Sequence, residues 1–164
     1  MEVRKAQHHD VDQMMVIVKQ AQQDLKEMNV DQWQNGYPNE TVLHQDIDLN
    51  KAYVIEENHV CGLMVISYND ETTYDPLKTW VKNTYMLIHR FAVVKQMQRT
   101  GIATEMIRQA SLMAKEMKME SIRIDTHEKN VRMRRFLEKC GFEERGIIYL
   151  KDGNPRIGYE LILI

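Results

Sequence analysis

The sequence lacks the features that indicate a membrane, disulfide-stabilised or nucleic-acid-binding protein. Its two cysteines, Cys61 and Cys140, are too few for a disulfide framework and match no metal-binding spacing. Its longest apolar stretch, Val60–Ser67, is far shorter than a transmembrane span, and its first ten residues hold no apolar core of a secretory signal. Lysine and arginine number 22 against 24 aspartates and glutamates, so there is no basic excess for nucleic acid. These absences predict a reduced, cytoplasmic protein with no metal and no nucleic-acid or membrane partner.

Proline is also scarce, and nothing in the chain reads as a linker between domains. The three prolines, Pro38, Pro76 and Pro155, each stand in a stretch where a loop is expected. No repeat or low-complexity run interrupts the 164 residues. A chain of this length can bury about two-thirds of its unfolded surface. We therefore expect one domain over residues 1–164.

Hydrophobic spacing predicts alternating short strands and helices. Apolar residues at helical spacing indicate a helix from Val11 to about Met28, and Asp10 followed by Gln13 resembles its capping box. Tyr85–Val94 is almost continuously apolar, which favours a central strand buried on both faces. Further helices are predicted at 40–49, 99–118 and 130–139, and further strands at 3–6, 51–56, 60–69, 121–126, 142–150 and 156–164. This order predicts an α/β (α+β) fold with a mixed sheet flanked by helices.

The segment from Phe91 to Ala103, FAVVKQMQRTGIA, is the most informative part of the chain. A buried strand ends in a polar loop, and Gly101 stands where the next helix begins. The first N–H groups of a helix have no helical partners and attract phosphate, and Lys95 and Arg99 add positive charge. Taken alone, the segment also fits an ordinary connection between a strand and a helix.

Two motifs together resemble the GNAT acetyltransferase superfamily. Gln98–Ala103 resembles its Q/R-x-x-G-x-G/A motif, and Asn130–Phe142 resembles its N-x-x-A-x-x-F-Y-x-x-x-G-F segment. The order of predicted elements is also that of the superfamily, so the resemblance covers nearly the whole chain. It implies a sheet of about six to seven strands, splayed between the parallel strands 85–94 and 121–126, with about four helices.

The resemblance also implies how acetyl-CoA binds, in the gap between those two strands. The backbone of Phe91, Ala92 and Val93 would hold the pantetheine arm and the acetyl carbonyl, and Asn130 would contact the pantetheine. The amides of 99–104 would hold the pyrophosphate. The cofactor-binding residues of the loop and first helical turn would be Gln98, Arg99, Thr100, Gly101, Ile102, Ala103 and Thr104.

The chemistry implied is direct attack of a neutral amine on a thioester, which needs a base, a polarised carbonyl and an acid for the leaving thiolate. Many members of the superfamily carry the acid as a tyrosine directly after the phenylalanine of the second motif. This chain has Leu137 there, which cannot donate a proton. The thiolate would then leave as the anion, take a proton from water, or take one from Tyr149, a substitute acid.

Three residues are candidates for the base. Asp125 precedes the motif asparagine by five residues, where ribosomal-protein alanine acetyltransferases of this superfamily carry a glutamate; pairing with Arg123 or capping the next helix explains it equally well. His89 lies on the central strand, on the face predicted for Phe91, and histidine titrates near neutral pH, although a core histidine is the competing interpretation. His127 is the third candidate.

Aromatic residues in the loop 31–39 are candidates for binding the acceptor. Trp33 and Tyr37 lie in this loop, which in the GNAT fold forms part of the acceptor side of the cleft. Aromatic side chains on loops often mark binding sites, whereas a tryptophan plugging the core is the alternative for Trp33.

The expected function is transfer of an acetyl group from acetyl-CoA to a primary amine of a small molecule or peptide, in a ternary complex. A homodimer is also expected, with Arg156–Ile164 as a strand able to pair with a second copy. Two alternatives remain open at this point. One is a non-catalytic acyl-CoA-binding or sensing domain on the same fold, and the other is an unrelated α+β small-molecule-binding domain.

Overall fold

The structure, a computed structural model of the chain, describes residues 1–69 and 73–164. Its strands are β1 (Glu2–Lys5), β2 (Ala52–Glu57), β3 (His59–Tyr68), β4 (Tyr85–Val93), β5 (Ser121–Thr126), β6 (Glu143–Tyr149) and β7 (Pro155–Ile162). Its α-helices are α1 (Val11–Glu27), α2 (Glu40–Asp48), α3 (Ile102–Glu116) and α4 (Val131–Lys139). Two 3₁₀ turns, η1 (His8–Asp10) and η2 (Lys95–Met97), precede α1 and α3. In this part of the chain, no helix combines the length and the apolar character needed to cross a membrane.

Every predicted helix and strand is present, with ends shifted by at most three residues. The predicted capping box of α1 is wrong. The carboxylate of Asp10 accepts the amide N–H of Gln7 at 2.7 Å within η1, and Gln13 Oε1 accepts the amide N–H of Val60 at 2.9 Å. The capping box is formed by Gln7 and Asp10 at the 3₁₀ turn η1, one turn before α1. The spacing of apolar residues does not reveal this extra turn.

The strands form an open sheet in the order β1-β2-β3-β4-β5-β7-β6. β4 and β5 pair in parallel, with Tyr85 to Leu87 opposite Ser121 to Arg123, while β1–β2, β2–β3, β5–β7 and β7–β6 pair antiparallel. The expected mixed sheet flanked by helices is confirmed. The expectation that Arg156–Ile164 offers a free edge is wrong, because β7 lies between β5 and β6 and pairs with both.

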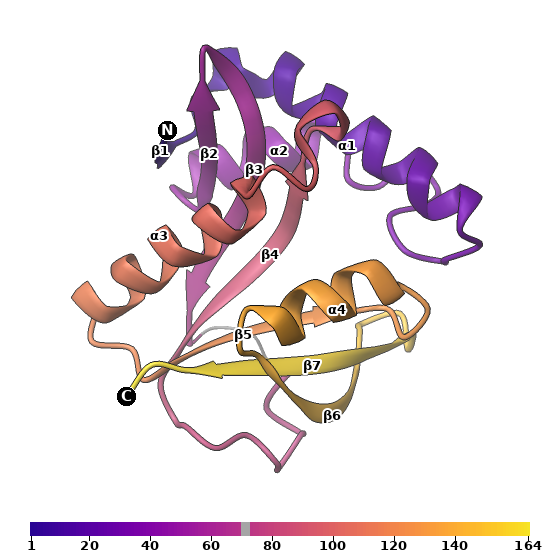
Figure 1. Cartoon of the computed structure of the whole chain (residues 1–164). Coiled ribbons are helices and arrows are strands. Elements are labelled where there is room, and N and C mark those ends of the chain that lie inside the picture. Colours follow the sequence, from indigo (N-terminus) through magenta and orange to yellow (C-terminus); the bar gives the residue numbers. More distant parts are fainter. Residues whose placement is uncertain (70–72) are drawn as a thin grey trace. The chain divides into compact units, whose positions relative to one another are not determined.

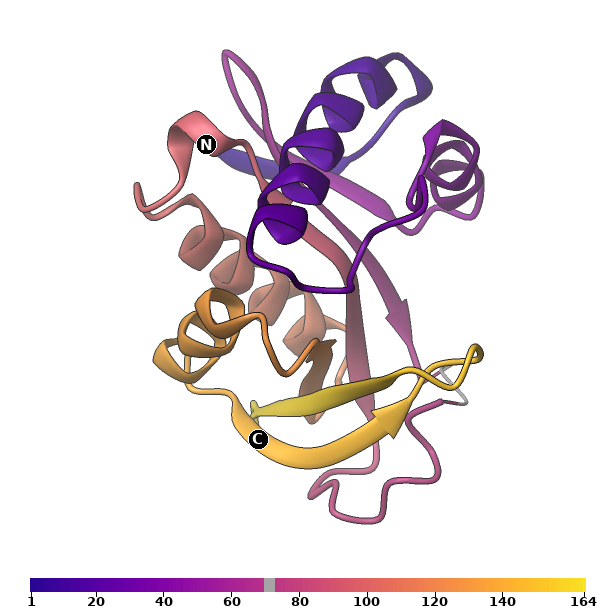
Figure 2. The same cartoon turned by 90° about the vertical axis from the view of Figure 1, so that its right-hand side faces the viewer.

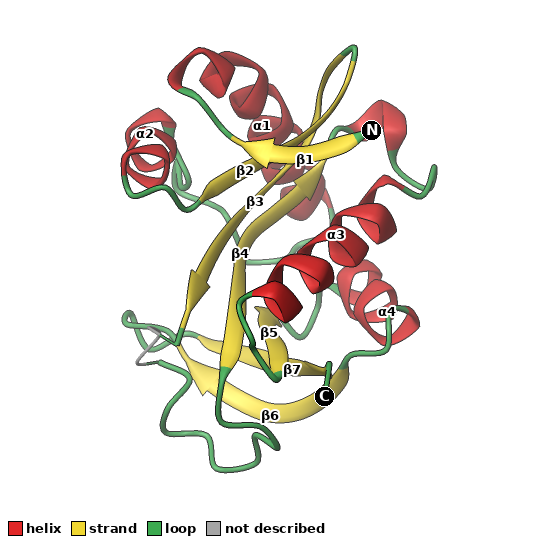
Figure 3. Ribbon diagram, turned by 90° about the vertical axis from the view of Figure 1, so that its left-hand side faces the viewer, coloured by secondary structure: helices red, strands yellow, loops and turns green. Residues whose placement is uncertain are grey.

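The chain divides into two compact units, unit 1 (Met1–Ile66 and His89–Gln109) and unit 2 (Ser67–Ile88 and Ala110–Ile164). In unit 1, α1 and α2 lie on one side of strands β1 to β3, and the first half of α3 lies on the other side (Figure 3). Gly62 of β3 allows that close approach: a Cβ there would stand 2.8 Å from Met106 Sδ of α3 and 3.1 Å from the Ala92 carbonyl. The bare glycine therefore helps to hold the start of α3 beside the end of β4.

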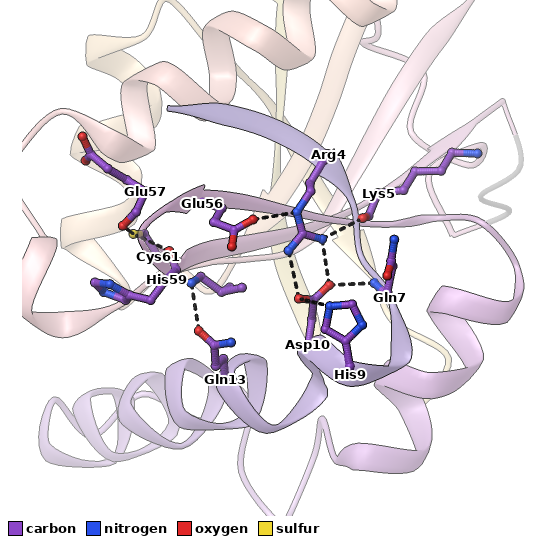
Figure 4. Close-up of polar contacts among 11 residues, drawn as sticks. Arg4, Lys5, Gln7, His9, Asp10, Gln13, Glu56, Glu57, His59 and Cys61 are labelled. Atoms are coloured by element: carbon purple, nitrogen blue, oxygen red, sulfur yellow. Dashed lines mark hydrogen bonds and ion pairs between the residues drawn. The ribbon is translucent and has the colours of Figure 1, made fainter.

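The beginning of α1 is fixed to the strands by an ion-pair network (Figure 4). Both guanidinium terminal nitrogens of Arg4 on β1 donate to the carboxylate of Asp10, at 2.8 and 2.9 Å, and its Nε donates to Glu56 of β2 at 2.8 Å. Asp10 is buried, and the hydrogen bond from Arg4 holds the pKa of its carboxyl below the usual value. The network locks the N-terminal strand to the helix start.

In unit 2, the sheet β5-β7-β6 is covered on both faces. Tyr159 of β7 accepts a hydrogen bond from Arg134 of α4 at 3.0 Å, while the next residue, Gly158, faces the indole of Trp80. Neighbouring residues of a strand point to opposite faces, so α4 covers one face and residues 73–84 cover the other (Figure 1). A buried apolar cluster of Tyr74, Tyr85, Leu87 and Ile148 lies under this second layer.

Candidate functional site

The end of β4 departs from regular strand geometry at Arg90. This residue takes a φ of +46°, which is sparsely populated by residues with a side chain. The regular alternation of faces is therefore interrupted between His89 and Phe91, where the sequence pattern alone predicts that both share a face. After the strand, the amide N–H of Val94 donates to the Cys61 carbonyl of β3 at 2.7 Å. The backbone that was predicted to hold the pantetheine arm, Phe91 to Val93, thus ends against β3.

The loop from Gln98 to Gly101 turns sharply into α3. Arg99 has a φ of +65° and Gly101 a φ of +93°, so two of the three residues before the helix start at Ile102 adopt left-handed backbone conformations. A Cβ built on Gly101 would meet no atom within 4 Å, so the space above it is open. The side-chain amide of Gln98 lies 3.5 Å from the Val93 carbonyl and joins this loop to the end of β4.

The first turn of α3 supplies amide N–H groups that have no acceptor within the helix. The helix begins at Ile102, and the earliest amide recorded in its ladder is that of Glu105, which donates to Gly101 at 3.0 Å. Amides in the first turn of a helix, with the helix dipole behind them, are able to bind an anion, so the amides at 102–104 remain candidates for the pyrophosphate. The predicted phosphate-binding residues are therefore brought together in unit 1.

The two predicted basic side chains of this region differ in their surroundings. Lys95 forms an ion pair with Asp24 of α1, with Nζ 3.2 Å from Oδ1, and its amide donates to Gln20 Oε1 at 2.8 Å. Arg99 is exposed. Lys95 thus holds η2 to α1, and Arg99 is the side chain that remains available for a phosphate.

Half-buried Arg90 and buried Asp46 form an ion pair that is not predictable from the sequence pattern. Arg90 Nε and Nη2 donate to the two carboxylate oxygens of Asp46 at 2.8 and 2.6 Å, and Nη1 donates to the hydroxyl of Tyr37 at 2.9 Å. In the sequence, the indication that Arg90 has a partner was its charge within an otherwise apolar predicted strand. This bidentate pair fixes the irregular backbone of β4 to α2 and to the loop before it.

The loop between α1 and α2, whose course is drawn in Figure 2, is held by several hydrogen bonds. Gln22 of α1 donates to the carbonyls of Tyr37 and Pro38 at 3.0 and 3.2 Å, and Gln34 donates back to the Gln22 carbonyl at 3.0 Å. Tyr37 is 46% exposed, and Trp33 is half-buried with a φ of +58°. Tyr37 therefore presents a fixed aromatic face to solvent, as expected of a binding residue.

The two candidate histidines have different positions. His89 lies in β4 within unit 1 and is half-buried. His127 follows β5, and its Nδ1 accepts the amide N–H of Lys129 at 3.0 Å. A neutral ring whose Nδ1 accepts must carry its proton on Nε2, so neither nitrogen of neutral His127 is free to take another proton without changing this contact.

Asp125 lies near the end of β5 in unit 2 and accepts a short hydrogen bond. The hydroxyl of Tyr74 donates to Asp125 Oδ2 at 2.5 Å. Of the groups considered as its partners, Arg123 donates to the Lys82 carbonyl at 2.7 Å, and Asn130 caps α4 by accepting the Met133 amide at 3.2 Å. The hydrogen bond between Tyr74 and Asp125 was not predictable from the sequence, because no pattern links a loop residue to a strand so distant in the chain.

The positions predicted for the acid also lie in unit 2. Leu137 is fully buried in α4 and contributes only apolar packing. Tyr149 is 61% exposed at the end of β6. Gly146 of β6 is in register with Gly158, which is in register with Asp125, so strand alternation places the side chain of Tyr149 on the opposite face from that of Asp125. Its role as an acid stays a prediction.

Metal-ligating side chains do not gather within residues 1–69 and 73–164. No group of three or more histidine, cysteine, aspartate or glutamate side chains there is arranged to hold a metal ion. Cys61 is buried and Cys140 partly buried, and neither forms a disulfide bond.

Comparison with known proteins identifies the family. The acetyltransferase (GNAT) family model matches residues 18–142. A GNAT-family acetyltransferase from Streptococcus agalactiae is 30% identical, with a TM-score of 0.87 over 98% of this chain and 94% of that chain. One from Listeria monocytogenes is 22% identical, with a TM-score of 0.75 over 99% and 94% of the two chains.

A third similar structure contains a bound cofactor. A protein assigned as a streptothricin acetyltransferase from Bacillus anthracis was solved in complex with acetyl coenzyme A; it is 26% identical, with a TM-score of 0.54 over 68% of this chain and 61% of that chain. No curated protein matches the sequence. The family model spans most of the chain and excludes the unrelated α+β binding domain. The chain belongs to the GNAT family of acetyltransferases.

Proposed function

We propose that the protein transfers the acetyl group of acetyl-CoA to a primary amine of a small molecule or peptide. The observation that carries the proposal is the start of α3 in a chain of the acetyltransferase family. There, left-handed backbone at Arg99 and Gly101 and open space at Gly101 precede the first-turn amides, which have no acceptor within the helix. The family model covers parts of both units, which supports one acetyltransferase domain over residues 1–164.

The described residues fit the donor. The amides at 102–104 and the side chain of Arg99 would hold the pyrophosphate, and the missing side chain of Gly101 leaves room for it. The backbone of Phe91 to Val93 would hold the pantetheine arm, and Asn130 would contact it. When bound, acetyl-CoA supplies an activated thioester carbonyl. The acceptor would lie on the side of the fixed loop that carries Tyr37 and Trp33.

Acetylation of a primary ammonium group requires that one proton leaves the nitrogen before the attack and that a second leaves it afterwards. Asp125 is the proposed base: its carboxylate takes a proton from the ammonium group, which leaves the neutral amine. As the C–N bond forms and the C–S bond breaks, the second amine proton goes to the departing thiolate or to water, and Asp125 returns its own proton to solvent. His89 is the alternative base, in unit 1.

A CoA-binding experiment tests the proposed donor site. Binding is measured as a rise in the melting temperature of the protein with CoA concentration. We expect CoA to stabilise the wild type and to leave Gly101→Trp unaffected, because the indole fills the open space above the loop. Gly153→Trp is the matched control, since Gly153 has a similar φ of +86° and also meets no atom within 4 Å. It should bind CoA normally.

Equal CoA affinity in the Gly101→Trp variant and the wild type would contradict the placement of the pyrophosphate. A melting temperature of unliganded Gly101→Trp close to that of Gly153→Trp shows that loss of binding is not loss of folding. Absence of any stabilisation of the wild type by CoA would contradict the proposed donor.

A non-catalytic acyl-CoA-binding or sensing role is the second candidate. The observation that favours it is Leu137, whose fully buried side chain occupies the position of the usual acid. Such a protein would bind acetyl-CoA but release no thiol when amines are added. Release of CoA thiol with polyamines, aminoglycosides, amino acids or peptides would exclude it.

A further inference from the structure

The loop that leads into α3 begins at two consecutive backbone amides, and each is held by a different element of unit 1. The amide N–H of Val94, the first residue after β4, donates to the Cys61 carbonyl of β3 at 2.7 Å. The next amide, that of Lys95, donates to Gln20 Oε1 of α1 at 2.8 Å. Because two successive peptide groups are held from two sides, the point where the chain leaves β4 has little freedom to shift.

A further hydrogen bond from α1 closes these contacts into a ring. Gln13 Oε1 of α1 accepts the amide N–H of Val60 at 2.9 Å, and Val60 directly precedes Cys61 in β3. Gln13 and Gln20 are separated by about two turns of α1, so they lie on the same face of the helix. Hydrogen bonds therefore lead from α1 to β3, from β3 to the end of β4, and from there back to α1.

The same face of α1 also holds the side chain of Lys95. Asp24 lies one turn beyond Gln20, and its Oδ1 is 3.2 Å from Lys95 Nζ. The ammonium end of this pair is 59% exposed, so solvent weakens it. The hydrogen bond from Gln20 to the backbone amide does not depend on charge. Gln20 is therefore the stronger of the two attachments.

Local hydrogen bonds carry the attachment forward along the loop. The amide of Met97 donates to the Val94 carbonyl at 3.0 Å and that of Gln98 to the Lys95 carbonyl at 3.3 Å, which closes the 3₁₀ turn η2. The hydroxyl of Thr100 then donates to the Met97 carbonyl at 2.5 Å. A shift of the first residue of η2 would therefore move the loop as far as the start of α3.

Gln20 contributes little to the packing of its own helix. The apolar face of α1 is buried through Met14, Ile17 and Val18, whereas Gln20 is half-buried and exposed Gln23 bonds only to Glu27 of the same helix, at 3.0 Å. Removal of the Gln20 amide group therefore releases the loop while the apolar contacts that hold α1 stay in place.

We infer that Gln20 is a positioning residue for the loop that binds the pyrophosphate of CoA, and that it acts through the amide of Lys95. This inference rests on the proposed function. Gln20 does not touch the ligand. It restricts the loop that carries Arg99 and the amides at 102–104 to positions suited to the pyrophosphate. Without it, the loop samples further positions, and the affinity for CoA falls in proportion to the fraction that can bind.

Binding of CoA to Gln20→Met tests this role. Methionine has nearly the same length as glutamine and suits a helix but offers no oxygen acceptor. We expect the Kd for CoA, measured by NMR titration, to rise about 5-fold, the effect of one net hydrogen bond. Binding of S-acetylpantetheine, which lacks the pyrophosphate, should stay as in the wild type. Gln23→Met, the same change at an exposed position of α1, is the matched control and should bind CoA normally.

Amide hydrogen exchange in the unliganded protein tests the attachment itself. The Lys95 amide should exchange faster in Gln20→Met than in the wild type, because it loses its acceptor. The Val60 amide should exchange as before, since its acceptor Gln13 is still present. Gln20→Glu keeps an acceptor oxygen and should restore the slow exchange of Lys95. Melting temperatures of the unliganded variants show that each one folds.

Faster exchange of Lys95 together with weaker binding of CoA and unchanged binding of S-acetylpantetheine supports the inference. Three results would overturn it. If Lys95 exchanges faster but CoA binds as tightly as to the wild type, the hydrogen bond is purely structural. If both ligands bind more weakly by the same factor, Gln20 does not act on the pyrophosphate loop. If the exchange of Lys95 is unchanged, Gln20 does not hold the loop.

The same measurements separate this inference from the proposed function. A wild type that binds CoA, with a Gln20→Met variant of equal affinity, contradicts the role of Gln20 alone. A wild type that does not bind CoA contradicts the proposed donor and the role of Gln20 with it, while hydrogen exchange still reports whether α1 holds the loop.

Discussion

Three aspartates with low exposure, two buried in unit 1 and one half-buried in unit 2, are held by different kinds of partner. In unit 1, Asp10 and Asp46 each receive two N–H bonds from one guanidinium, that of Arg4 and that of Arg90. In unit 2, Asp125 receives the neutral hydroxyl of Tyr74. Two charge-assisted N–H bonds from a guanidinium are stronger than one hydrogen bond from a neutral hydroxyl.

The arginine-bound carboxylates have clear structural roles. Asp10 joins the N-terminal strand to α1, and Asp46 holds Arg90, whose φ of +46° shapes the end of β4. Protonation of either carboxylate would weaken its ion pair with arginine. Asp125 lies opposite a glycine of the neighbouring strand and accepts the hydroxyl of Tyr74, and its role as the base stays a proposal.

The largest expected effect is that of Asp125→Asn on catalysis. The amide cannot accept the ammonium proton, so we expect kcat to fall about 100-fold or more at neutral pH, and less at high pH, where the amine is already neutral. Steady-state rates of thiol release across pH measure this. Asp75→Asn, a change of charge on the neighbouring exposed residue, is the control and should retain activity. An unchanged profile in Asp125→Asn would transfer the role of base to His89.

The opposite pattern is expected for Asp10→Asn, which should weaken folding and leave the chemistry intact. Loss of the charge-assisted bonds to Arg4 should lower the free energy of unfolding by about 2–3 kcal/mol at pH 7. Urea denaturation measures this, with Asp12→Asn as a control at an exposed position two residues further along α1. A loss of activity without loss of stability would contradict the structural role.

The pH dependence of that loss has a definite sign. Arg4 holds the pKa of Asp10 below the usual value, so the stabilisation is fully present above the pKa of an unfolded aspartate, about 3.9, and is lost as the pH falls through the folded-state pKa. The difference between wild type and Asp10→Asn should therefore be largest at neutral pH and shrink below about pH 4. A difference that persists at lower pH would refute the ion-pair explanation.

The smallest effect is expected for Tyr37→Phe. It removes the hydroxyl that accepts from Arg90 but leaves the bidentate pair with Asp46, so stability should change by about 1 kcal/mol or less. If the loop binds the acceptor, KM for the amine should rise a few-fold while KM for acetyl-CoA stays constant. Equal changes in both constants would argue against an acceptor role.

Much of this architecture was predictable from local patterns. Local sequence features predict three of the elements directly. They are the apolar spacing of α1, the glycine that ends α4 with a φ of +95° and the continuous apolar run of β4. The open loop at Gly101 was predictable because its motif is local, and it lies at the start of α3 as expected.

Long-range features were not predictable for physical reasons. The insertion of β7 between β5 and β6 depends on pairing between strands, which alternation of apolar residues does not specify. The contact of Tyr74 with Asp125 depends on Gly158 and Gly146, two glycines far along the chain that leave the sheet bare. The ion pair of Arg90 with Asp46 likewise joins residues 44 positions apart.

Acetyl transfer itself is the most direct test of the central claim that this chain is an amine acetyltransferase. Wild-type protein is incubated with acetyl-CoA and each of a panel of polyamines, aminoglycosides, amino acids and peptides, and released thiol and acetylated amine are measured in the same reaction. The account predicts that at least one amine yields the two products in equal amounts. Stabilisation by acetyl-CoA without any amine-dependent thiol release would contradict it and would identify the protein as a sensor of its cofactor.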